Sequence, residues 1–318
     1  MRVTTILCTY NRCQSLAKAL DSLAVSILPE NIEWEVLVVD NNSTDQTTAV
    51  VEGFRRRYPG RFRYLFEGRP GKSYALNSGI REARGDVLAF VDDDEIVEQT
   101  WLQNLTSVLH DGQWAGSGGR ILPMKSFKPP HWLALDGPYN LVGALCANSD
   151  LGDVPGDFKA PPLGGNVAFR REMFNKYGLF RTDLGPFPDS KIGFEDTEFG
   201  RRLIAGGERL RYVPSAVAYH EVHESRVRKE WFLAWWFDFG QGSVRETGKR
   251  LSAEKTLKVL ARILLGIPQW VLTVDSQARF YRKCQIWYEV GKIVEVYQQA
   301  RNRKRPRAQS EAWGEPRV

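Results

Sequence analysis

The sequence predicts an α/β fold in which helices flank a mostly parallel sheet, and three observations support this prediction. Short apolar runs, long enough for buried strands and too short for helices, alternate with helical segments four times before residue 100. No hairpin signal separates these runs, and parallel strands require a crossover through a helix. The chain of 318 residues is 42% hydrophobic and 26% charged, enough for one large α/β domain with an appendage or for two small domains.

The alternation defines the expected elements in order. Apolar runs predict strands at 3–7, 34–39, 62–66 and 87–91, and helical periodicity predicts helices at 15–26, 46–58 and 73–84. Further strands are expected at 114–122, 164–170, 209–213 and 216–219, and further helices at 101–109 and 194–205. The stretch 123–162 is rich in Pro, Gly and Asp, and we expect a functional loop there, a candidate lid over a bound ligand.

The C-terminal third differs in charge and composition. Residues 221–318 carry 19 Lys and Arg and 11 Asp and Glu, a net charge of +8, whereas residues 1–220 carry 25 and 27, a net charge of −2. Six of the ten tryptophans also lie after residue 221, and basic charge beside tryptophan favours anionic lipid over nucleic acid as a partner. We therefore expect an α/β domain at 1–225, a helical extension at 226–300 with helices at 253–274 and 277–299, and a disordered basic tail at 301–318.

The cysteines and the start of the chain predict the compartment. Cys8, Cys13, Cys146 and Cys284 form no closely spaced pair, so we expect reduced thiols in a cytoplasmic protein. The chain opens on a strand pattern and not on a signal peptide, and no apolar run reaches the roughly 18 residues that a membrane-spanning helix needs.

Three consecutive aspartates follow the strand predicted at 87–91. Asp92, Asp93 and Asp94 repel one another unless a cation lies among them, and ligands bind beyond the carboxyl ends of parallel strands. Mg²⁺ and Mn²⁺ favour carboxylate oxygens and bridge to phosphates. The run indicates a metal and diphosphate site, but alone it is equally consistent with an acidic turn capping a helix that begins near Val97.

Polar clusters recur at the ends of predicted strands. Thr9 to Arg12 follows the first strand, Asp40 to Asp45 follows the second, and Glu195-Asp196 is expected to behave in the same way. Because the carboxyl ends of parallel strands meet at one edge of a sheet, we expect these clusters to lie together there.

In their order and spacing these clusters resemble the family 2 glycosyltransferases, which have the GT-A fold. The resemblance covers about residues 1–225, which would then form a catalytic domain. It implies transfer of a sugar from a nucleotide-sugar donor to an acceptor hydroxyl of a glycan or lipid-linked glycan, in a metal-assisted single displacement that inverts the anomeric carbon. The matching stretches are Thr9-Tyr10-Asn11-Arg12, Val38-Val39-Asp40-Asn41-Asn42-Ser43-Thr44-Asp45, Asp92-Asp93-Asp94, Gly164-Gly165-Asn166-Val167-Ala168-Phe169-Arg170 and Glu195-Asp196.

The same resemblance assigns the donor and metal contacts. Asp40 would accept a hydrogen bond from an N–H of the nucleotide base. Asp94 would bind Mn²⁺ or Mg²⁺ directly, and His220 would complete the metal site. Asp92 would contact the ribose or a metal-bound water molecule. His223 gives a zinc-like spacing with His220, but no other ligand set supports zinc. The implied donor contacts are Thr9, Tyr10, Asn11, Arg12, Asp40, Asn42, Lys72, Asp92 and Asp93.

The acceptor side follows from the remaining motifs. Gly164, Gly165 and Asn166 resemble an acceptor wall where absent side chains leave room for a sugar, and Asp196 resembles the general base. A neighbouring carboxylate raises the pKa of Asp196 and a helix N-terminus lowers it, so the sequence leaves the balance open. Glu195 would assist Asp196 or orient the acceptor.

The resemblance also suggests UDP as the nucleotide, cell envelope polysaccharide synthesis as the pathway, and no nucleic acid partner. Residues 226–307 would touch the cytoplasmic face of a membrane or pack on the catalytic domain. Arg226 and Arg228 would meet a diphosphate or lipid phosphate, or remain solvated charges.

Other functions are less consistent with the sequence. A dinucleotide-dependent oxidoreductase or a nucleotidyltransferase would carry a Gly-rich loop after the first strand, and Cys8 to Arg12 contains no glycine. The remaining alternative is a catalytically inactive nucleotide-sugar-binding or membrane scaffold protein of the same fold, against which the presence of both Asp94 and Asp196 argues.

Overall fold

The computed structural model describes residues 1–302 except 125–126, 147–148, 188–192 and 249–250. It consists of two compact units, Met1–Phe232 and Leu233–Val318, each of which is described by itself. The domain boundary expected after residue 225 stays a prediction. The disordered tail expected at 301–318 lies outside the described residues, apart from its first two positions.

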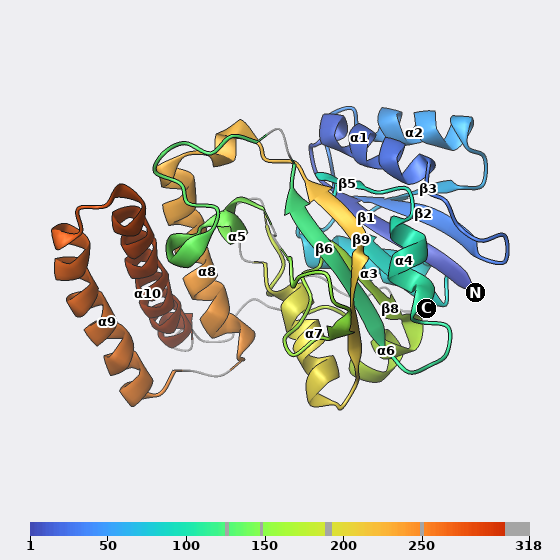
Figure 1. The fold of residues 1–318 in the computed structure, drawn as a ribbon. Helices are drawn as coiled ribbons and strands as arrows, with labels where there is room; N and C mark the ends of the chain where they lie inside the picture. Colours follow the sequence, from blue (N-terminus) through green and yellow to red (C-terminus); the bar gives the residue numbers. More distant parts are fainter. Residues whose placement is uncertain (125–126, 147–148, 188–192, 249–250, 303–318) are drawn as a thin grey trace. The chain divides into compact units, whose positions relative to one another are not determined.

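The first unit is built on a mixed sheet, whose nine described strands have the order β3-β2-β1-β4-β8-β6-β9-β5, with β7 pairing to β9 (Figure 1). Strands β1 to β4 are mutually parallel, as predicted. Strand β8 runs antiparallel to both of its neighbours, which the sequence did not indicate. The strands are β1 (Arg2–Thr9), β2 (Glu33–Asp40), β3 (Phe62–Phe66), β4 (Val87–Val91), β5 (Glu95–Val97), β6 (Gly116–Pro123), β7 (Gly156–Asp157), β8 (Asn166–Arg170) and β9 (Leu210–His220).

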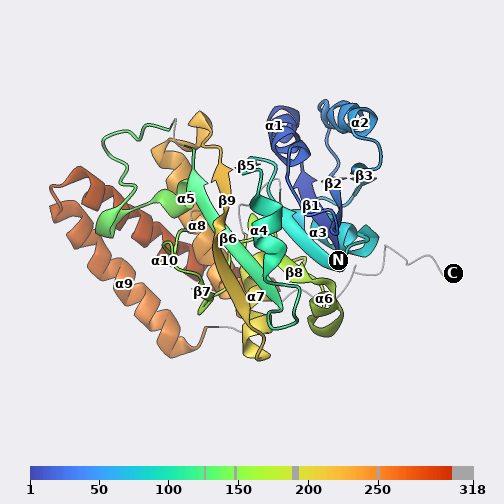
Figure 2. The ribbon, with the colours of Figure 1, turned by 45° about the vertical axis from the view of Figure 1, so that its right-hand side comes forward.

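Helices cover both faces of this sheet (Figures 1 and 2). On one face pack α1 (Cys13–Ala24), α2 (Thr47–Arg57) and α4 (Trp101–Ser107), and on the other α3 (Lys72–Glu82), α6 (Arg171–Tyr177) and α7 (Glu195–Ala205). Successive side chains of a strand point to opposite faces. Accordingly Val87, Ala89 and Val91 of β4 join the first core, whereas Leu88 and Phe90 join the second. Burial on both faces explains why β4 is an unbroken apolar run.

Three local predictions differ from the structure. Residues Glu95–Val97 form strand β5 and not the start of a helix, because they pair with Ala218 to His220 of β9. The strands expected at 209–213 and 216–219 are one strand, which passes through a register shift opposite Gly119 and Arg120. The stretch 123–162 is not all loop, since it contains η1 (Gly137–Tyr139), α5 (Val142–Leu145) and β7.

The second unit is helical. Helix α8 (Lys229–Glu246) begins in the first unit, and α9 (Ala253–Leu272) and α10 (Ser276–Asn302) follow, with η2 (Glu224–Arg226) before them. Helix α9 continues through Pro268, where an interruption was expected. Trp236 of α8 packs edge-on against Tyr281 and Tyr288 of α10, so tryptophan serves packing within this unit. Among the described residues we find no helix with the length and apolar character needed to cross a bilayer.

Candidate active site

The loops that follow β1 and β2 are joined by hydrogen bonds. The Asn11 side-chain oxygen accepts the backbone N–H of Thr44 at 2.7 Å, and the backbone N–H of Asn11 donates to the Ser43 hydroxyl at 2.9 Å. Asn11 has φ of 52°, a left-handed conformation that asparagine tolerates better than most residues. The two predicted clusters therefore form one surface at the carboxyl edge of the sheet.

Asp40, the expected base contact, is buried beneath this surface. One carboxylate oxygen accepts the backbone N–H of Ser43 and the other accepts the Tyr64 hydroxyl, both at 2.8 Å. Two other expected donor contacts, Tyr10 and Asn42, are exposed. Asp40 is thus fixed in place by protein donors, while Tyr10 and Asn42 are free to face solvent.

Asn41 lies inside the matched motif, but no role was predicted for it. Its side-chain oxygen accepts the N–H of Gly71 at 2.8 Å, and its amide nitrogen donates to the carbonyls of Glu67 at 3.1 Å and Arg69 at 2.6 Å. Gly71 has φ of 125°, which favours glycine. Asn41 thereby shapes the loop that leads to Lys72 at the start of α3.

The middle aspartate of the turn between β4 and β5 is directed inward. Asp93 accepts the Thr9 hydroxyl at 2.7 Å and Arg12 at 2.8 Å. Burial raises the pKa of Asp93 to about 6, against the lowering effect of Arg12. Thr9 and Asp93, two of the expected donor contacts, are therefore buried and bound to each other, and their contact with the donor stays a prediction.

Asp94 is buried among cations. Its carboxylate lies 3.0 Å from Arg12 and 2.8 Å from Arg226, and its other oxygen lies 3.4 Å from Nε2 of His220. Burial alone would raise the pKa of Asp94, but His220, Arg226 and Arg12 together hold it below its usual range. Asp94 is therefore an anion held in place by cationic neighbours.

His220 is oriented towards Asp94. Its Nδ1 lies 2.8 Å from the Glu221 carbonyl, and this contact directs Nε2 towards the carboxylate of Asp94. Within the described residues no group of three or more His, Cys, Asp and Glu could hold a metal by itself. A carboxylate and an imidazole fit a divalent ion whose remaining positions are filled by phosphate oxygens and water.

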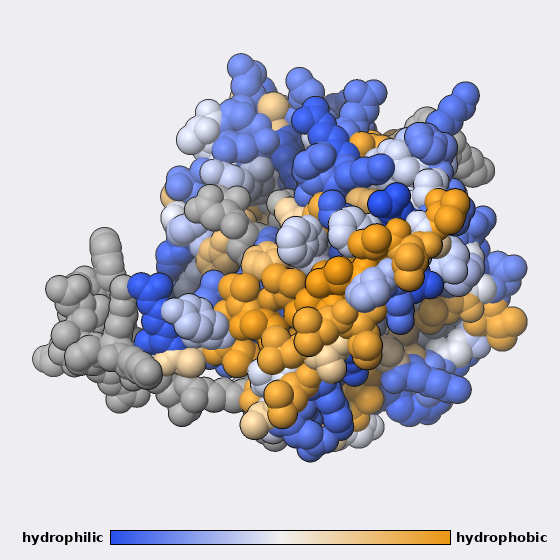
Figure 3. Space-filling model, turned by 90° about the vertical axis from the view of Figure 1, so that its left-hand side faces the viewer, coloured by the Kyte–Doolittle hydropathy of each residue, from blue (hydrophilic) through white to orange (hydrophobic). Residues whose placement is uncertain are grey.

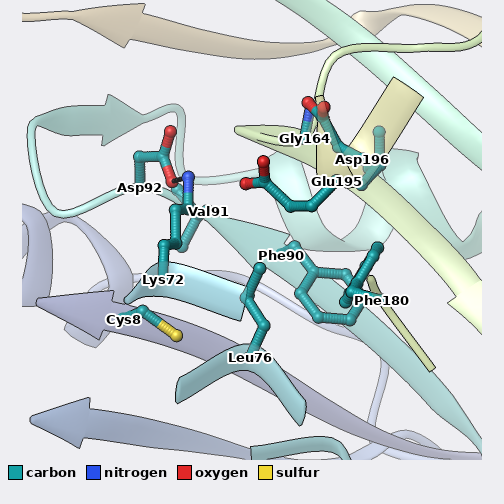
Figure 4. A pocket seen from close by; sticks show the side chains of 11 residues that line it. Cys8, Lys72, Leu76, Phe90, Val91, Asp92, Gly164, Phe180, Glu195 and Asp196 are labelled. Atoms are coloured by element: carbon teal, nitrogen blue, oxygen red, sulfur yellow. Dashed lines mark hydrogen bonds and ion pairs between the residues drawn. The ribbon is translucent and has the colours of Figure 1, made fainter. Parts of the chain in front are cut away.

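A second part of the site surrounds a cavity of about 10 Å³, roughly the room that one water molecule needs (Figure 4). At this cavity the Nζ atom of Lys72 forms an ion pair with a carboxylate oxygen of Asp92, at 2.5 Å. Burial opposes the charge of Lys72, but Asp92 and Glu195 raise its pKa well above the usual range, so it remains a cation. The lining residues are Cys8, Lys72, Leu76, Phe90, Val91, Asp92, Gly164, Val167, Phe180, Glu195 and Asp196.

Glu195 and Asp196 face this cavity from the first turn of α7, the helix predicted at 194–205. One turn later, the ring of the buried Phe199 stacks on the ring of Phe174, with 4.5 Å between the ring centres. It also packs edge-on against the ring of Phe169, with 5.2 Å between the ring centres. This aromatic packing fixes the position of both carboxyl groups.

The two carboxyl groups differ in their hydrogen bonds. Asp196 accepts backbone N–H groups from Gly164 at 2.5 Å and Thr197 at 2.6 Å. One buried oxygen of Glu195 has no protein partner. Burial and then Asp196 raise the pKa of Glu195 to about 8, and burial also raises that of Asp196. Glu195 therefore keeps its proton to higher pH than an ordinary carboxyl group does.

The expected acceptor wall has a different physical basis. A Cβ at Gly164 would lie 2.7 Å from the Asp196 carboxylate, and a Cβ at Gly165 would collide with Glu95. The absent side chains thus leave room for the carboxyl groups of Asp196 and Glu95, and the role of these glycines as an acceptor wall stays a prediction. Asn166 donates to the carbonyls of Arg120 at 3.0 Å and Ala216 at 2.8 Å, so its buried amide ties strands together and its contacts do not support acceptor binding.

Glu95 is a site residue that the sequence analysis missed. It is fully buried, accepts the N–H of Asp92 at 3.1 Å, and keeps its other oxygen without a protein partner. Its position directly after the aspartates was the available signal, but only the contact with Gly165 shows that it belongs to the site.

Comparisons with known proteins agree with this architecture. The family model described as glycosyl transferase family 2 matches residues 4–178. The succinoglycan biosynthesis protein ExoM of Rhizobium meliloti is 31% identical over 252 residues, which cover 78% of this chain and 74% of that protein.

Solved structures show the same fold. The mannosyltransferase PcManGT from Pyrobaculum calidifontis, in complex with GDP-Man and Mn²⁺, aligns with a TM-score of 0.62 at 18% identity, over 94% of this chain and 87% of that one. S. aureus TarS 1-349 in complex with UDP aligns with a TM-score of 0.53 at 15% identity, over 95% of this chain and 92% of that one.

The fold and the carboxylate-lined edge define a glycosyltransferase of the GT-A type. The chain belongs to glycosyl transferase family 2, as the family match over more than half of its length and the relative ExoM both show.

Proposed function

We propose that this glycosyltransferase moves a sugar from a UDP-sugar to an acceptor hydroxyl with inversion at the anomeric carbon, assisted by Mn²⁺ or Mg²⁺. The observation that carries the proposal is the division of the carboxyl edge into two parts. Asp94 lies with His220, Arg12 and Arg226, whereas Glu195 and Asp196 lie across a small cavity from Lys72. Lys72 influences the pKa of Asp94, Glu195 and Asp196 alike, so it links the two parts.

The first part suits the donor diphosphate. Asp94 and His220 would hold the divalent cation, which when bound supplies Lewis-acid stabilisation of the charge on the leaving diphosphate. A diphosphate at this cation would lie beside Arg12 and Arg226, whose guanidinium groups match phosphate oxygens. The Mn²⁺ in the PcManGT structure and the UDP in the TarS structure support these assignments.

The second part suits the acceptor. In the proposed step Asp196 takes the proton of the acceptor hydroxyl while that oxygen bonds to the anomeric carbon. The bond from the anomeric carbon to the diphosphate oxygen breaks, and its electron pair leaves with the nucleoside diphosphate. The raised pKa of Glu195 favours its protonated form, which can orient the acceptor by donating a hydrogen bond.

The acceptor is proposed to be a growing glycan or a lipid-linked glycan. The support is that ExoM is named for succinoglycan biosynthesis, a polysaccharide pathway. We further propose peripheral contact with the cytoplasmic face of a membrane through the helical C-terminal part.

Calorimetric titration tests the donor assignment. The full chain is titrated with UDP, GDP and dTDP, each with and without Mn²⁺, and Asp94→Ala is titrated in parallel. Metal-dependent binding of UDP that Asp94→Ala abolishes is the expected result. Preference for GDP or dTDP would overturn the choice of UDP, and the absence of binding by any nucleotide would contradict the donor site itself.

A further inference from the structure

Helix α9 carries an apolar stripe that its own unit leaves exposed. Leu257, Leu260, Leu264, Ile267 and Val271 recur every three or four residues and are between 41% and 69% exposed. The stripe extends over 15 residues, from Leu257 to Val271, which is roughly 21 Å along the helix. The neighbouring face of α9 packs on α10 through Val259, which is 4% exposed, and through Gly266, where a Cβ would lie 3.2 Å from Ile286.

The apolar surface widens towards the α9–α10 turn. From Ile263 to Val274 the sequence contains no charged residue. Leu265, Leu272 and Val274, at 66%, 79% and 96% exposed, lie outside the stripe. Figure 3 shows the apolar side chains gathered in one patch with hydrophilic side chains around it. A contiguous exposed apolar patch of this kind marks an interaction surface.

Cations flank this surface. Residues 253–283 contain six basic side chains, Lys255, Lys258, Arg262, Arg279, Arg282 and Lys283, and two acidic ones, Glu254 and Asp275. Lys283 lies 5.5 Å from the centre of the Trp270 ring, which places a cation beside an aromatic ring near the turn. Leucine, isoleucine and valine on one face, with lysine, arginine and tryptophan at the border, are the pattern of a helix that lies in a membrane interface.

The charges distinguish lipid from a second copy of the chain. Two copies joined through the stripe would bring like charges together, because the excess of four cations lies on the same hairpin. Anionic headgroups, by contrast, are attracted by about 1 kcal/mol for each lysine or arginine near the surface. Acyl chains accept the apolar stripe at the same time, so one partner satisfies both features.

We propose that the α9–α10 hairpin is a binding surface for anionic lipid bilayers, with the stripe and the turn entering the interface and the flanking cations meeting phosphate headgroups. The inference deepens the proposed peripheral membrane contact and rests on the proposed function for its consequence, access to a lipid-linked acceptor. Its test needs neither donor nor metal, so its failure is distinguishable from failure of the donor site.

Vesicle co-sedimentation of the full chain tests the surface. Binding is expected to vesicles of phosphatidylcholine mixed with phosphatidylglycerol, to be weaker on phosphatidylcholine alone, and to fall as salt rises. Leu264→Glu is expected to weaken binding at least about tenfold. The matched control is Val154→Glu in the first unit, where an equally apolar side chain is 79% exposed. Equal binding by both variants and the parent would overturn the proposal.

A second variant, which changes only a charge, keeps the test valid if Leu264→Glu does not fold. Arg279 is exposed, and Arg279→Gln leaves every apolar contact in place while it is expected to weaken binding to the anionic vesicles about fivefold and to reduce the salt dependence. Sedimentation velocity without lipid tests whether a second copy of the chain binds this surface instead. A dimer that Leu264→Glu dissociates would overturn the lipid assignment in favour of a second copy, whereas a monomer supports it.

Discussion

The donor part and the acceptor part of the site are equally buried, yet their carboxyl groups behave in opposite ways. Asp94 is surrounded by Arg12, Arg226 and His220, and its pKa falls below the usual range. Glu195 has another carboxyl group as its neighbour, and its pKa rises to about 8. Burial raises the pKa of both groups, but the cationic neighbours outweigh burial at Asp94, whereas Asp196 adds to it at Glu195. One part can bind a cation and the other can handle a proton.

Removing the proposed base should have the largest effect. Asp196→Asn is expected to slow sugar transfer to water or to an acceptor by about 10²–10⁴-fold, because a general base contributes an effect of that size. Release of UDP from a UDP-sugar measures the rate.

Glu198→Gln is the control for that variant, since Glu198 lies in the same helical turn and pairs with Arg202. A loss of rate in Glu198→Gln that matched Asp196→Asn would show that the charge of the turn, and not a base, is needed.

The cations around Asp94 should matter next. Arg226→Gln is expected to weaken UDP binding in the presence of Mn²⁺ by about 10–100-fold, because a charge-assisted hydrogen bond to phosphate is lost. The exposed Arg228 provides the control as Arg228→Gln, which alters the same net charge. Equal losses, measured by calorimetry, would reduce the role of Arg226 to a general electrostatic attraction.

Substitution of Gly165 should lower the stability of the protein. Gly165→Ala places a Cβ against Glu95, and we expect the free energy of unfolding to fall by about 1–3 kcal/mol in urea denaturation. Gly143→Ala adds a Cβ that meets open space, so it should leave stability almost unchanged. If both substitutions were neutral, the close approach of Glu95 and Gly165 would be of no consequence.

Glu195 should show its effect as a pH dependence of stability. Its folded pKa of about 8 exceeds the usual 4.5, so between these values the folded protein keeps a proton that the unfolded chain has lost. Stability therefore falls as pH rises through this window, by at most about 1.4 kcal/mol for each pH unit. Glu195→Gln should reduce this slope in metal-free protein, and an unchanged slope would contradict the raised pKa of Glu195.

Sequence alone predicted the first half of the fold closely, because its strands are short apolar runs between helices. The strands at 62–66 and 87–91 have the predicted bounds. Strand β5 was missed because Glu95–Val97 is held by pairing to β9 across more than 120 positions, for which no local signal exists. The antiparallel direction of β8 is likewise a tertiary property, yet it brings Asn166 opposite Val91 at the carboxyl edge.

The site was predicted in position more than in contacts. The sequence placed Asp94, His220, Lys72 and Asp196 at one edge, where the structure has them. It could not show that Thr9 and Asp93 bind each other, because both are polar residues at strand ends, the same signal that indicates a ligand contact. Asn41 and Glu95 act through a backbone N–H of Gly71 and of Asp92, contacts that residue type does not reveal.

The central claim is that Asp94 serves the donor and Asp196 serves the acceptor. The most direct measurement is the affinity for UDP in the presence of Mn²⁺, determined side by side for Asp94→Asn and Asp196→Asn. Asp94→Asn is expected to lose metal-dependent binding, whereas Asp196→Asn is expected to bind UDP as tightly as the parent chain. Equal loss in both variants, or retention in Asp94→Asn, would contradict the division of the site.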